Sequence, residues 1–444
     1  MKKTLSILLA GVLVLSLTAC KGANPAGGAD SSAAVQTKAD GSAETETKLA
    51  KLVVSGATGE PTSVQHLMMD LFIKEHPEAG GEYTICDINT REQILKTAIS
   101  AGEPPAVGFY WGTRVNTFYN ADMCLDLRSY LDEDLLNSIN KRMLDPCIGP
   151  NGEVFAIPAA TVYHLAFYNK DMMDRYGFEV PETWDDLTKI FARLKEDGIY
   201  GFATNSASMQ DCLYGMVYAE LEEKVGKGTS YAIASGEESV APGSPAGEVI
   251  RTCIEQVKEW YEAGYWYPGD GGINCTADDA NAAFAQERCL VLFNFSGALG
   301  THEKACSFKI SSFMKPTSAK GMVSYENIEP DVYFIPSNCS KEQIASGVEF
   351  LKLILSKEVQ QGVVDGGSIP AVDTYEYDNI SEPLQEIMDR MQGENLISGL
   401  NPTRTSSEMQ TFIKQQIFAA PCSGSMTIDQ TLEEMEAIRL RIKK

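Results

Sequence analysis

Aromatic rings beside polar side chains are the feature of this sequence best suited to chemistry, and the chemistry they suit is the binding of a sugar. The stretch FYWGTR (109–114) places Tyr110 and Trp111 at the end of an expected strand. Open α/β sheets form their ligand crevices outside the carboxyl ends of strands. Aromatic rings can stack on the C–H faces of a sugar while polar side chains bond to its hydroxyl groups. We therefore expect Tyr110 and Trp111 to lie in a binding site, although ordinary packing is the alternative for any single aromatic residue.

Motifs for catalysis and metal binding are absent from the sequence. The four histidines form no pair at i, i+4 spacing, and no HExxH, G-x-S-x-G or P-loop pattern occurs. The acidic stretch DGGINCTADD (270–279) does not match a calcium-binding loop, so a solvated turn before a helix is the favoured interpretation. Paired carboxylates remain an open alternative because the chain has 61 acidic residues. On balance we expect a binding protein without a catalytic residue, a metal or a cofactor.

The N-terminus is typical of an export signal that ends at a lipid attachment site. Residues 1–19 combine two lysines with an apolar run too short for a permanent membrane anchor. The stretch LTAC (17–20) resembles the lipobox of bacterial lipoproteins, in which a diacylglycerol is attached to the cysteine, here Cys20. Lipidation would hold the protein on the cell membrane, facing the extracellular side or the periplasm; an ordinary secretory signal is the alternative. Residues 20–48 are too polar to fold, so we expect a flexible tether.

A strongly acidic charge excludes some partners. The chain carries 37 basic and 61 acidic residues, a formal net charge of −24, and shows no basic patch. Such a surface repels nucleic acid and anionic lipid headgroups. The eleven cysteines include no C-x-x-C pair, and Cys212, Cys253 and Cys289 lie in apolar stretches that suit buried free thiols. Disulfides remain an open alternative in an exported protein.

Short apolar runs alternate with helical patterns, which predicts an α/β protein with mainly parallel sheets. A helix is expected after Pro61, where apolar residues recur at helical spacing. Ser340 with Gln343, and Thr427 with Gln430, fit capping boxes that begin two further helices. About four hundred residues follow the tether, too many for one ordinary core, so we expect two lobes. The expected strands cover 49–57, 81–88, 105–111, 153–159, 164–169, 289–295 and 332–337.

Four segments resemble the extracellular solute-binding proteins of bacterial ABC importers, specifically the family 1 carbohydrate-binding group that includes maltose-binding protein. The strand–helix cadence of the family runs through nearly all of residues 49–444, and the YNKD...G...PETWDDL run is its most specific part. The resemblance implies that Asn169 and Asp171 of that run cap the next turn and that Trp184 packs on a core face. The four segments are GEPPAVGFYWGTRVNTFYNADMCLDLRSYL (102–131), GEVFAIPAATVYHLAFYNKDMMDRYGFEVPETWDDL (152–187), FAQERCLVLFNFSG (284–297) and SKEQIASGVEFLKLILSKEVQQGVVDGGSIPA (340–371).

The resemblance implies a two-lobed periplasmic-binding-protein-like fold of type II, with a ligand cleft between the lobes and three hinge crossovers. The first lobe would comprise residues 49–160 and 315–373, and the second lobe residues 161–314 and 374–444. The lobes would close over the ligand by hinge motion and present a surface to the permease subunits of the importer. The crossovers are expected near residues 158–163, 312–317 and 372–378.

Family contacts carried over to matching positions imply a partial binding site. Asn294 and Ser296 lie in a segment that often carries a tryptophan, which is missing here, and the position near Met409, often aromatic in maltodextrin binders, has no aromatic residue in this sequence. These missing stacking residues disfavour maltose and favour another oligosaccharide. The implied ligand-binding residues are Thr58, Glu60, Tyr110, Trp111, Arg114, Tyr163, Tyr214, Asn294 and Ser296.

Together these features predict a lipid-anchored, monomeric receptor that captures a carbohydrate and delivers it to an ABC importer. A binder of a polyamine or peptide is the first alternative. A cationic ligand would call for a carboxylate cluster beside the rings, and Glu60 alone does not make one. A lipoprotein glycosidase is the second alternative, and it would need two carboxylates ~5 to 10 Å apart across the scissile bond.

Overall fold

The computed structural model describes residues 47–57, 62–87, 90–112, 114–207, 210–392, 396–398 and 407–442. Its strands are β1 (Leu52–Ala57), β2 (Gly81–Ile85), β3 (Val107–Trp111), β4 (Ile157–Asn169), β5 (Tyr200–Thr204), β6 (Cys289–Phe295), β7 (Ile310–Phe313), β8 (Glu326–Phe334), β9 (Ile369–Pro370) and β10 (Leu396–Ser398). Its longer helices are α1 (Ser63–Glu75), α2 (Arg91–Ser100), α6 (Lys170–Tyr176), α7 (Trp184–Glu196), α8 (Asp211–Lys224), α10 (Pro245–Glu262), α11 (Ala277–Ala285), α12 (Leu299–Ala305), α13 (Lys341–Ile354), α14 (Lys357–Asp365), α15 (Glu382–Met391), α16 (Ser407–Gln415) and α18 (Ile428–Ile442). Within these ranges no helix has the length and apolar character needed to cross a bilayer.

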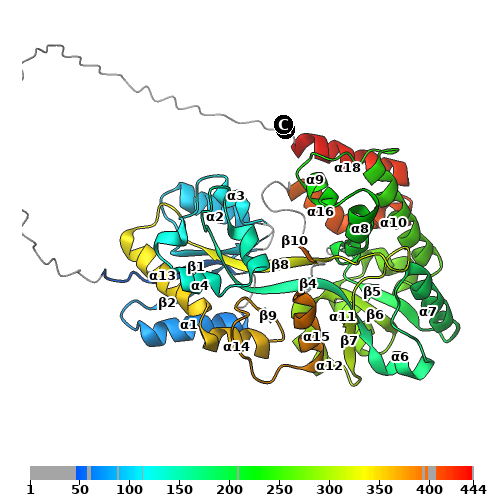
Figure 1. Cartoon of the computed structure of the whole chain (residues 1–444), viewed down its shortest axis with the longest axis horizontal. Coiled ribbons are helices and arrows are strands. Elements are labelled where there is room, and N and C mark those ends of the chain that lie inside the picture. The colour runs from blue at the N-terminus through cyan, green and yellow to red at the C-terminus, as the bar shows by residue number, and fades with distance from the viewer. Residues whose placement is uncertain are drawn as a thin grey trace, which may run out of the picture. The chain divides into compact units, whose positions relative to one another are not determined.

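Two groups of strands are joined through the long strand β4 (Figure 1). In the first group the order is β2-β1-β3-β8-β4, with β10 beside β8 and β9 beside β4. In the second group β6 lies between β4 and β5, and β7 also pairs with β4. The pairs of β1 with β2 and β3, and of β5 with β6, are parallel, but β4 is antiparallel to every strand it pairs with in the described ranges. The expectation of mainly parallel sheets is therefore wrong, because β4 runs antiparallel to β6, β7, β8 and β9, and β8 runs antiparallel to β3.

Three segments connect the two groups, which confirms the predicted two-lobed α/β fold with hinge crossovers. Within β4, residues up to Tyr163 pair with β8, whereas residues from His164 onward pair with β6. The second connection leads from β7 to β8, and the third leads from β9 to α15, which packs on β7. The sequence predicted two separate strands where β4 is continuous. The register of β4 shifts between Pro158 and Ala160, and a bulge is one of the few places where a strand tolerates proline.

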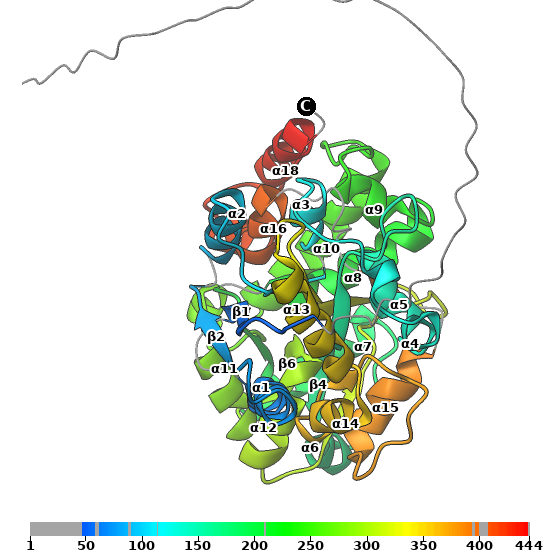
Figure 2. The same cartoon turned by 90° about the vertical axis from the view of Figure 1, so that its left-hand side faces the viewer.

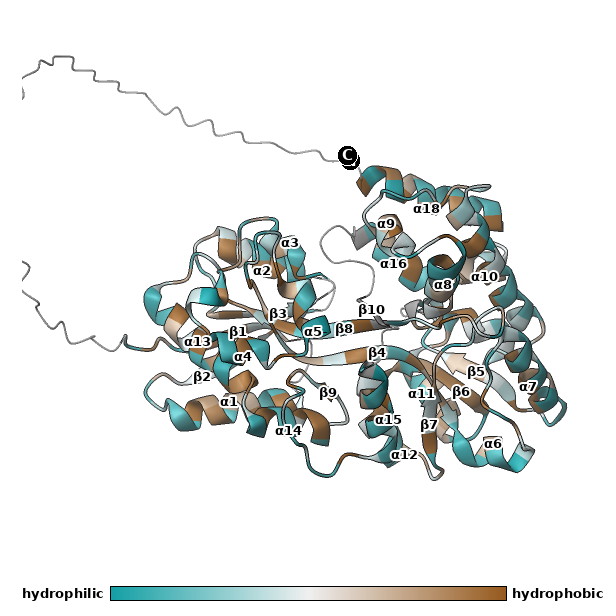
Figure 3. Cartoon of the chain, in the orientation of Figure 1, coloured by the Kyte–Doolittle hydropathy of each residue, from teal (hydrophilic) through white to brown (hydrophobic). Residues whose placement is uncertain are grey.

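Helices cover the strands with their apolar faces. In the first group α1, α13 and α14 pack against one another, and α13 lies on β1 (Figure 2). In the second group the fully buried Trp260 of α10 packs edge to face on Phe191 of α7 and Phe202 of β5, with ring centroids 5.6 and 6.0 Å apart. Figure 3 shows hydrophobic and hydrophilic residues alternating along helices such as α7, as expected for helices with one buried face.

Helix starts follow the capping signals of the sequence. Both predicted capping boxes are confirmed: Ser340 exchanges hydrogen bonds with Gln343, and Thr427 does so with Gln430. Asn169 accepts a hydrogen bond from the backbone N–H of Met172 and caps α6, as predicted. Asp171 instead accepts a hydrogen bond from the backbone N–H of Lys309 at 3.2 Å.

Two further predictions concern buried side chains. Trp184 is buried, and its indole N–H donates to the Pro316 carbonyl at 2.9 Å, which confirms its predicted core position. Every cysteine in the described ranges is a free thiol, and the three expected to be buried, Cys212, Cys253 and Cys289, are buried.

Candidate binding site

The carboxyl end of β3 presents two aromatic residues with different surroundings. Tyr110 is buried, packs edge to face on Phe118, and donates a hydrogen bond from its hydroxyl to Glu92 Oε2 at 3.0 Å. Burial and the neighbouring Glu92 raise the pKa of the Tyr110 phenol. Trp111 is only partly buried and lies opposite Asp331 of β8 in the strand register. Of the two predicted platform residues, Trp111 is therefore the one that is not fully buried.

Arg91 is the principal site residue that sequence reasoning missed. It is the first residue of α2 and is fully buried, and its guanidinium carbon lies 3.8 Å from the centroid of the Trp111 ring. Within the described part of the chain, none of its three side-chain nitrogens has a hydrogen-bond partner. Gly56 leaves room for Arg91 to reach Trp111. Its φ is +117°, and a Cβ at this position would lie 2.3 Å from the Phe109 carbonyl oxygen and 3.3 Å from Arg91 Cδ.

A second guanidinium lies at the same ring. The guanidinium carbon of the predicted residue Arg114 is 5.3 Å from the Trp111 ring centroid, and its Nε has no hydrogen-bond partner. Burial is the main cause that lowers the pKa of Arg91; Tyr110 and Asp331 oppose this shift, and the charge of Arg114 adds to it. The end of β3 therefore holds an indole ring and two nearby cationic donors.

Asp331 on β8 is the acidic member of this group. Burial, followed by the negative charge of Glu329, raises the pKa of its carboxyl to about 7. A carboxyl with that pKa is only partly ionised at neutral pH. Asp331 is thus a weak counter-charge for the two arginines.

The predicted residues Tyr163 and Ser296 meet on the first crossover. The Ser296 hydroxyl accepts a hydrogen bond from the Tyr163 backbone N–H at 2.9 Å, and both side chains are buried. Among the residues that the structure describes, neither the Tyr163 hydroxyl nor Nδ1 of the next residue, His164, has a hydrogen-bond partner. The Nε2 atom of His164 lies 3.8 Å from Glu329 Oε2. The crossover therefore carries polar atoms that a ligand or water could bind.

The remaining predicted residues lie elsewhere. Tyr214 is fully buried on α8, where its ring packs edge to face on Tyr218. The side-chain amide of Asn294 donates to Asn281 Oδ1 at 3.2 Å and contacts His302 Nε2 at 3.3 Å. Thr58 and Glu60 lie outside the described residues. The structure thus brings Tyr110, Trp111 and Arg114 together at one strand end and Tyr163 and Ser296 together on the crossover, and the binding roles of all nine residues stay predictions.

His302, the partner of Asn294, should make stability depend on pH. It packs against Phe167 and Phe284, and burial lowers its pKa from 6.5 to about 4. Between these values the unfolded chain binds a proton here that the folded chain does not, so stability falls as the pH falls. We expect this residue to remove about 3 kcal/mol of unfolding free energy across the interval. The unfolding free energy can be measured in urea at both ends of this pH interval. His302→Gln should lose this pH-dependent change in unfolding free energy, and the exposed control His66→Gln should keep it. The same pH dependence in both variants would show that His302 is not its source.

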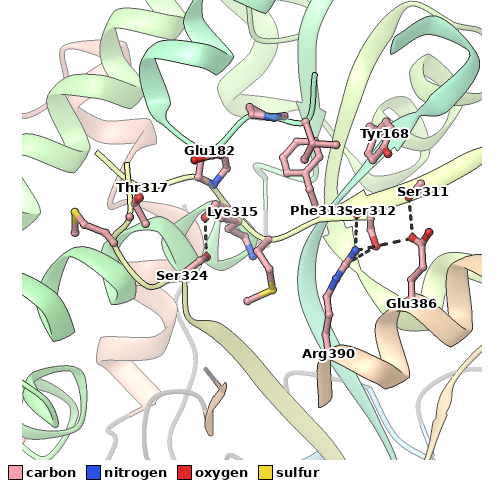
Figure 4. Close-up of a pocket in the computed structure, with 16 residues that line it drawn as sticks. Tyr168, Glu182, Ser311, Ser312, Phe313, Lys315, Thr317, Ser324, Glu386 and Arg390 are labelled. Carbon is pink, nitrogen blue, oxygen red and sulfur yellow. Dashed lines mark hydrogen bonds and ion pairs between the residues drawn. The ribbon is translucent and has the colours of Figure 1, made fainter. Parts of the chain in front are cut away.

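A pocket of about 540 Å³ lies along the second crossover, between Glu182 and α15 (Figure 4). Its polar groups already bond to one another. Ser311 donates to Glu386 at 2.8 Å, and Arg390 donates to the Ser312 hydroxyl and carbonyl at 2.8 and 2.7 Å. These bonds join α15 to β7. The pocket therefore lies at a connection between the two strand groups and is separate from the site at Trp111.

Comparison with known proteins identifies similar sequences. A family model described as bacterial extracellular solute-binding protein matches residues 82–383. The multiple sugar-binding protein of Streptococcus mutans serotype c is 22% identical over 269 residues, 56% of this chain and 58% of that protein. The melibiose/raffinose/stachyose-binding protein MelE of Bacillus subtilis is 28% identical over 158 residues, 35% of each chain. The chain thus spans less than two thirds of the length of these curated relatives.

Solved structures agree with the fold. A chitin oligosaccharide binding protein superposes with a TM-score of 0.74 at 18% sequence identity, covering 88% of this chain and 99% of that one. Identity this low establishes a shared fold and nothing further.

Proposed function

Because the chain belongs to the bacterial extracellular solute-binding protein family, we propose that it captures a sugar outside the cell and delivers it to the membrane subunits of an ABC importer. The relatives from Streptococcus mutans and Bacillus subtilis, which are named for sugar binding, support this choice of ligand. The three connections between the strand groups support a capture step in which the lobes close by hinge motion.

The observation that carries the proposal is the combination of ring and donors at the end of β3. Trp111 is only partly buried, and Arg91 and Arg114 bring to its ring nitrogens that have no hydrogen-bond partner within the described residues. A sugar needs both an apolar surface for its C–H faces and hydrogen-bond partners for its oxygen atoms. The unpartnered Tyr163 hydroxyl supplies a further polar atom on the crossover.

A polyamine is a weaker candidate ligand. Two guanidinium groups around Trp111 would repel a cation, whereas recognition of an amine requires a carboxylate cluster at the ring. The nearest described carboxyl on the paired strand, Asp331, has its pKa raised to about 7 and is only partly charged at neutral pH.

Glycoside hydrolysis is a second candidate function that one observation favours. Asp331 and Glu329 lie two residues apart on β8, and a raised carboxyl pKa suits a general acid. We expect no hydrolysis, because the family and its relatives are binding proteins. Release of reducing ends from oligosaccharides, abolished by Asp331→Asn, would establish the enzyme instead.

The attachment and the lobe boundaries are part of the same proposal. Lipidation of Cys20 would anchor a monomer to the membrane, with residues 20–48 as tether. The change of pairing partner between Tyr163 and His164 supports lobes of 49–160 with 315–373 and of 161–314 with 374–444. Labelled fatty acid should enter the wild-type protein and be absent from Cys20→Ser.

Thermal shift measurements against neutral and acidic oligosaccharides, polyamines and peptides test the ligand class. A ligand that binds only the folded state raises the melting temperature, by ~2.7 kcal/mol of added stability at a hundred times its Kd. We expect a shift with oligosaccharides and none with polyamines or peptides. Shifts confined to polyamines or peptides would replace the sugar by that ligand class.

A further inference from the structure

Within the described residues, Arg91 and Arg114 are unlike most arginines in forming no ion pair with an acidic residue; Arg288, which donates to the Tyr267 hydroxyl, is a further exception. Although acidic residues outnumber basic residues by 61 to 37, no ion pair joins either arginine to a carboxylate in the described part of the chain. Arginines in exposed positions find such partners, as Arg175 does with Glu287 at 2.9 Å and Arg128 with Asp126 at 2.6 Å. Two arginines beside Trp111 therefore form no ion pair with any described residue, although the chain is rich in acids.

The position of Arg91 is unfavourable in three ways. It is fully buried with all three side-chain nitrogens unbonded, and a buried charge without a partner is strongly destabilising. A second cation, Arg114, lies at the same indole ring. Arg91 also begins α2, where the helix dipole disfavours positive charge. The contacts with Trp111, Tyr110 and Phe109 offset only part of this cost.

The nearby carboxyl supplies only part of the missing charge, although the charges of Asp331 and Arg91 favour each other. Asp331 lies opposite Trp111 on β8, but its pKa is raised to about 7 by burial and by Glu329. Glu329 in turn lies 3.8 Å from His164. A fully ionised anion would therefore be a better partner for the two guanidinium groups than the protein's own acids.

We infer that Arg91 and Arg114, held on Trp111, form an anion-binding subsite and that the captured sugar carries a carboxylate, as a uronic acid does. The guanidinium group presents parallel N–H donors that match both oxygens of a carboxylate. The three side-chain nitrogens of Arg91 form no hydrogen bond within the described residues, so none of these donors is already engaged. This inference rests on the proposed sugar-binding function and names the class of sugar.

Matched pairs of sugars test the inference on the full-length protein. Calorimetry would compare trigalacturonate with its methyl ester, which removes the charge and keeps the rings, and glucuronate-substituted xylotetraose with xylotetraose. We expect at least one acid to bind ten times more tightly than its neutral counterpart or better. Arg91→Met should abolish this preference, because it should weaken binding of the acid at least ten times more than binding of its neutral counterpart.

The outcomes separate the two proposals. Binding of neutral sugars with no preference for the acids would overturn the acidic-sugar inference and leave the receptor function standing. Failure of every sugar to bind would count against both. A loss in Arg91→Met that is equal for acid and ester would make Arg91 a general structural residue of the site and would also overturn the inference.

A measurement without ligand provides an independent test. If only the bound ligand supplies a negative partner for Arg91, Arg91→Met removes a buried unpaired cation from the ligand-free protein. The substitution should then raise its melting temperature. The control Arg175→Met removes an exposed arginine paired with Glu287 and should change it little. A lower melting temperature in Arg91→Met than in the control would contradict the inference, because it would show that Arg91 stabilises the fold by itself.

Discussion

Replacing Lys315 with methionine is expected to lower the free energy of unfolding by about 3–5 kcal/mol, because the substitution leaves Glu326 buried without its positive partner. Lys315 Nζ lies 2.5 Å from Glu326 Oε2, and the two side chains are only 1% and 2% exposed. The Lys315 backbone N–H also donates to Glu326 Oε1 at 3.0 Å, and its ammonium group bonds to the His164 carbonyl. The ion pair thus links the second crossover to β8 and to the first crossover.

Urea unfolding of a double-mutant cycle would test the ion pair. Lys315→Met with Glu326→Gln removes both charges and keeps an acceptor for the backbone N–H, so we expect it to recover most of the loss. The control Lys320→Met breaks an exposed pair with Glu182 and should cost less than about 1 kcal/mol. If Lys315→Met lowered the free energy of unfolding no more than this control, the buried ion pair would not be important for stability.

The second large loss of stability is expected on replacing Gln360, because its side chain forms hydrogen bonds with backbone groups of two crossovers. This fully buried amide donates to the carbonyls of Ala159 and Ile354 at 3.0 and 2.8 Å. Its oxygen accepts from the N–H groups of Ala371 and Val372 at 2.7 and 3.3 Å. Ala159 belongs to the first crossover strand, and Ala371 begins the third connection.

Gln360→Met fills similar space but leaves these four backbone groups without their partner. Each buried unsatisfied group costs about 1–3 kcal/mol, so we expect a total loss of at least about 3 kcal/mol after relaxation. The matched control is Gln385→Met, because Gln385 is exposed and its amide bonds to the nearby Asp389. Unfolding curves of the two variants should differ clearly, and superimposed curves would contradict the role given to Gln360.

Local features of the fold were predictable because they depend on residues close in sequence. The caps at Ser340, Thr427 and Asn169 each involve a hydrogen bond that spans three residues. The alternation of strands and helices likewise follows from the short-range pattern of apolar residues. Pro158 misled the same reasoning, since a register shift lets β4 continue past it.

Strand direction could not be predicted in this way. The apolar pattern of β4 is the same whether its neighbours run parallel or antiparallel to it. Only the course of the chain, which uses β4 and β8 to pass between the lobes, makes their pairs with each other and with β3 and β6 antiparallel.

For the candidate site, the sequence alone placed Tyr110 and Trp111 at a strand end, because strand and aromatic residues are adjacent in the chain. It could not place Arg91, which precedes Trp111 by twenty positions and reaches the ring only because α2 begins there and Gly56 leaves room. Lys315 and Glu326 meet for a similar reason, through the turn of the second crossover. The sequence thus determined the elements and their ends through local bonding and periodicity, whereas the charges buried beside Trp111 and within the hinge were decided by tertiary packing, which brings together residues that no local pattern relates.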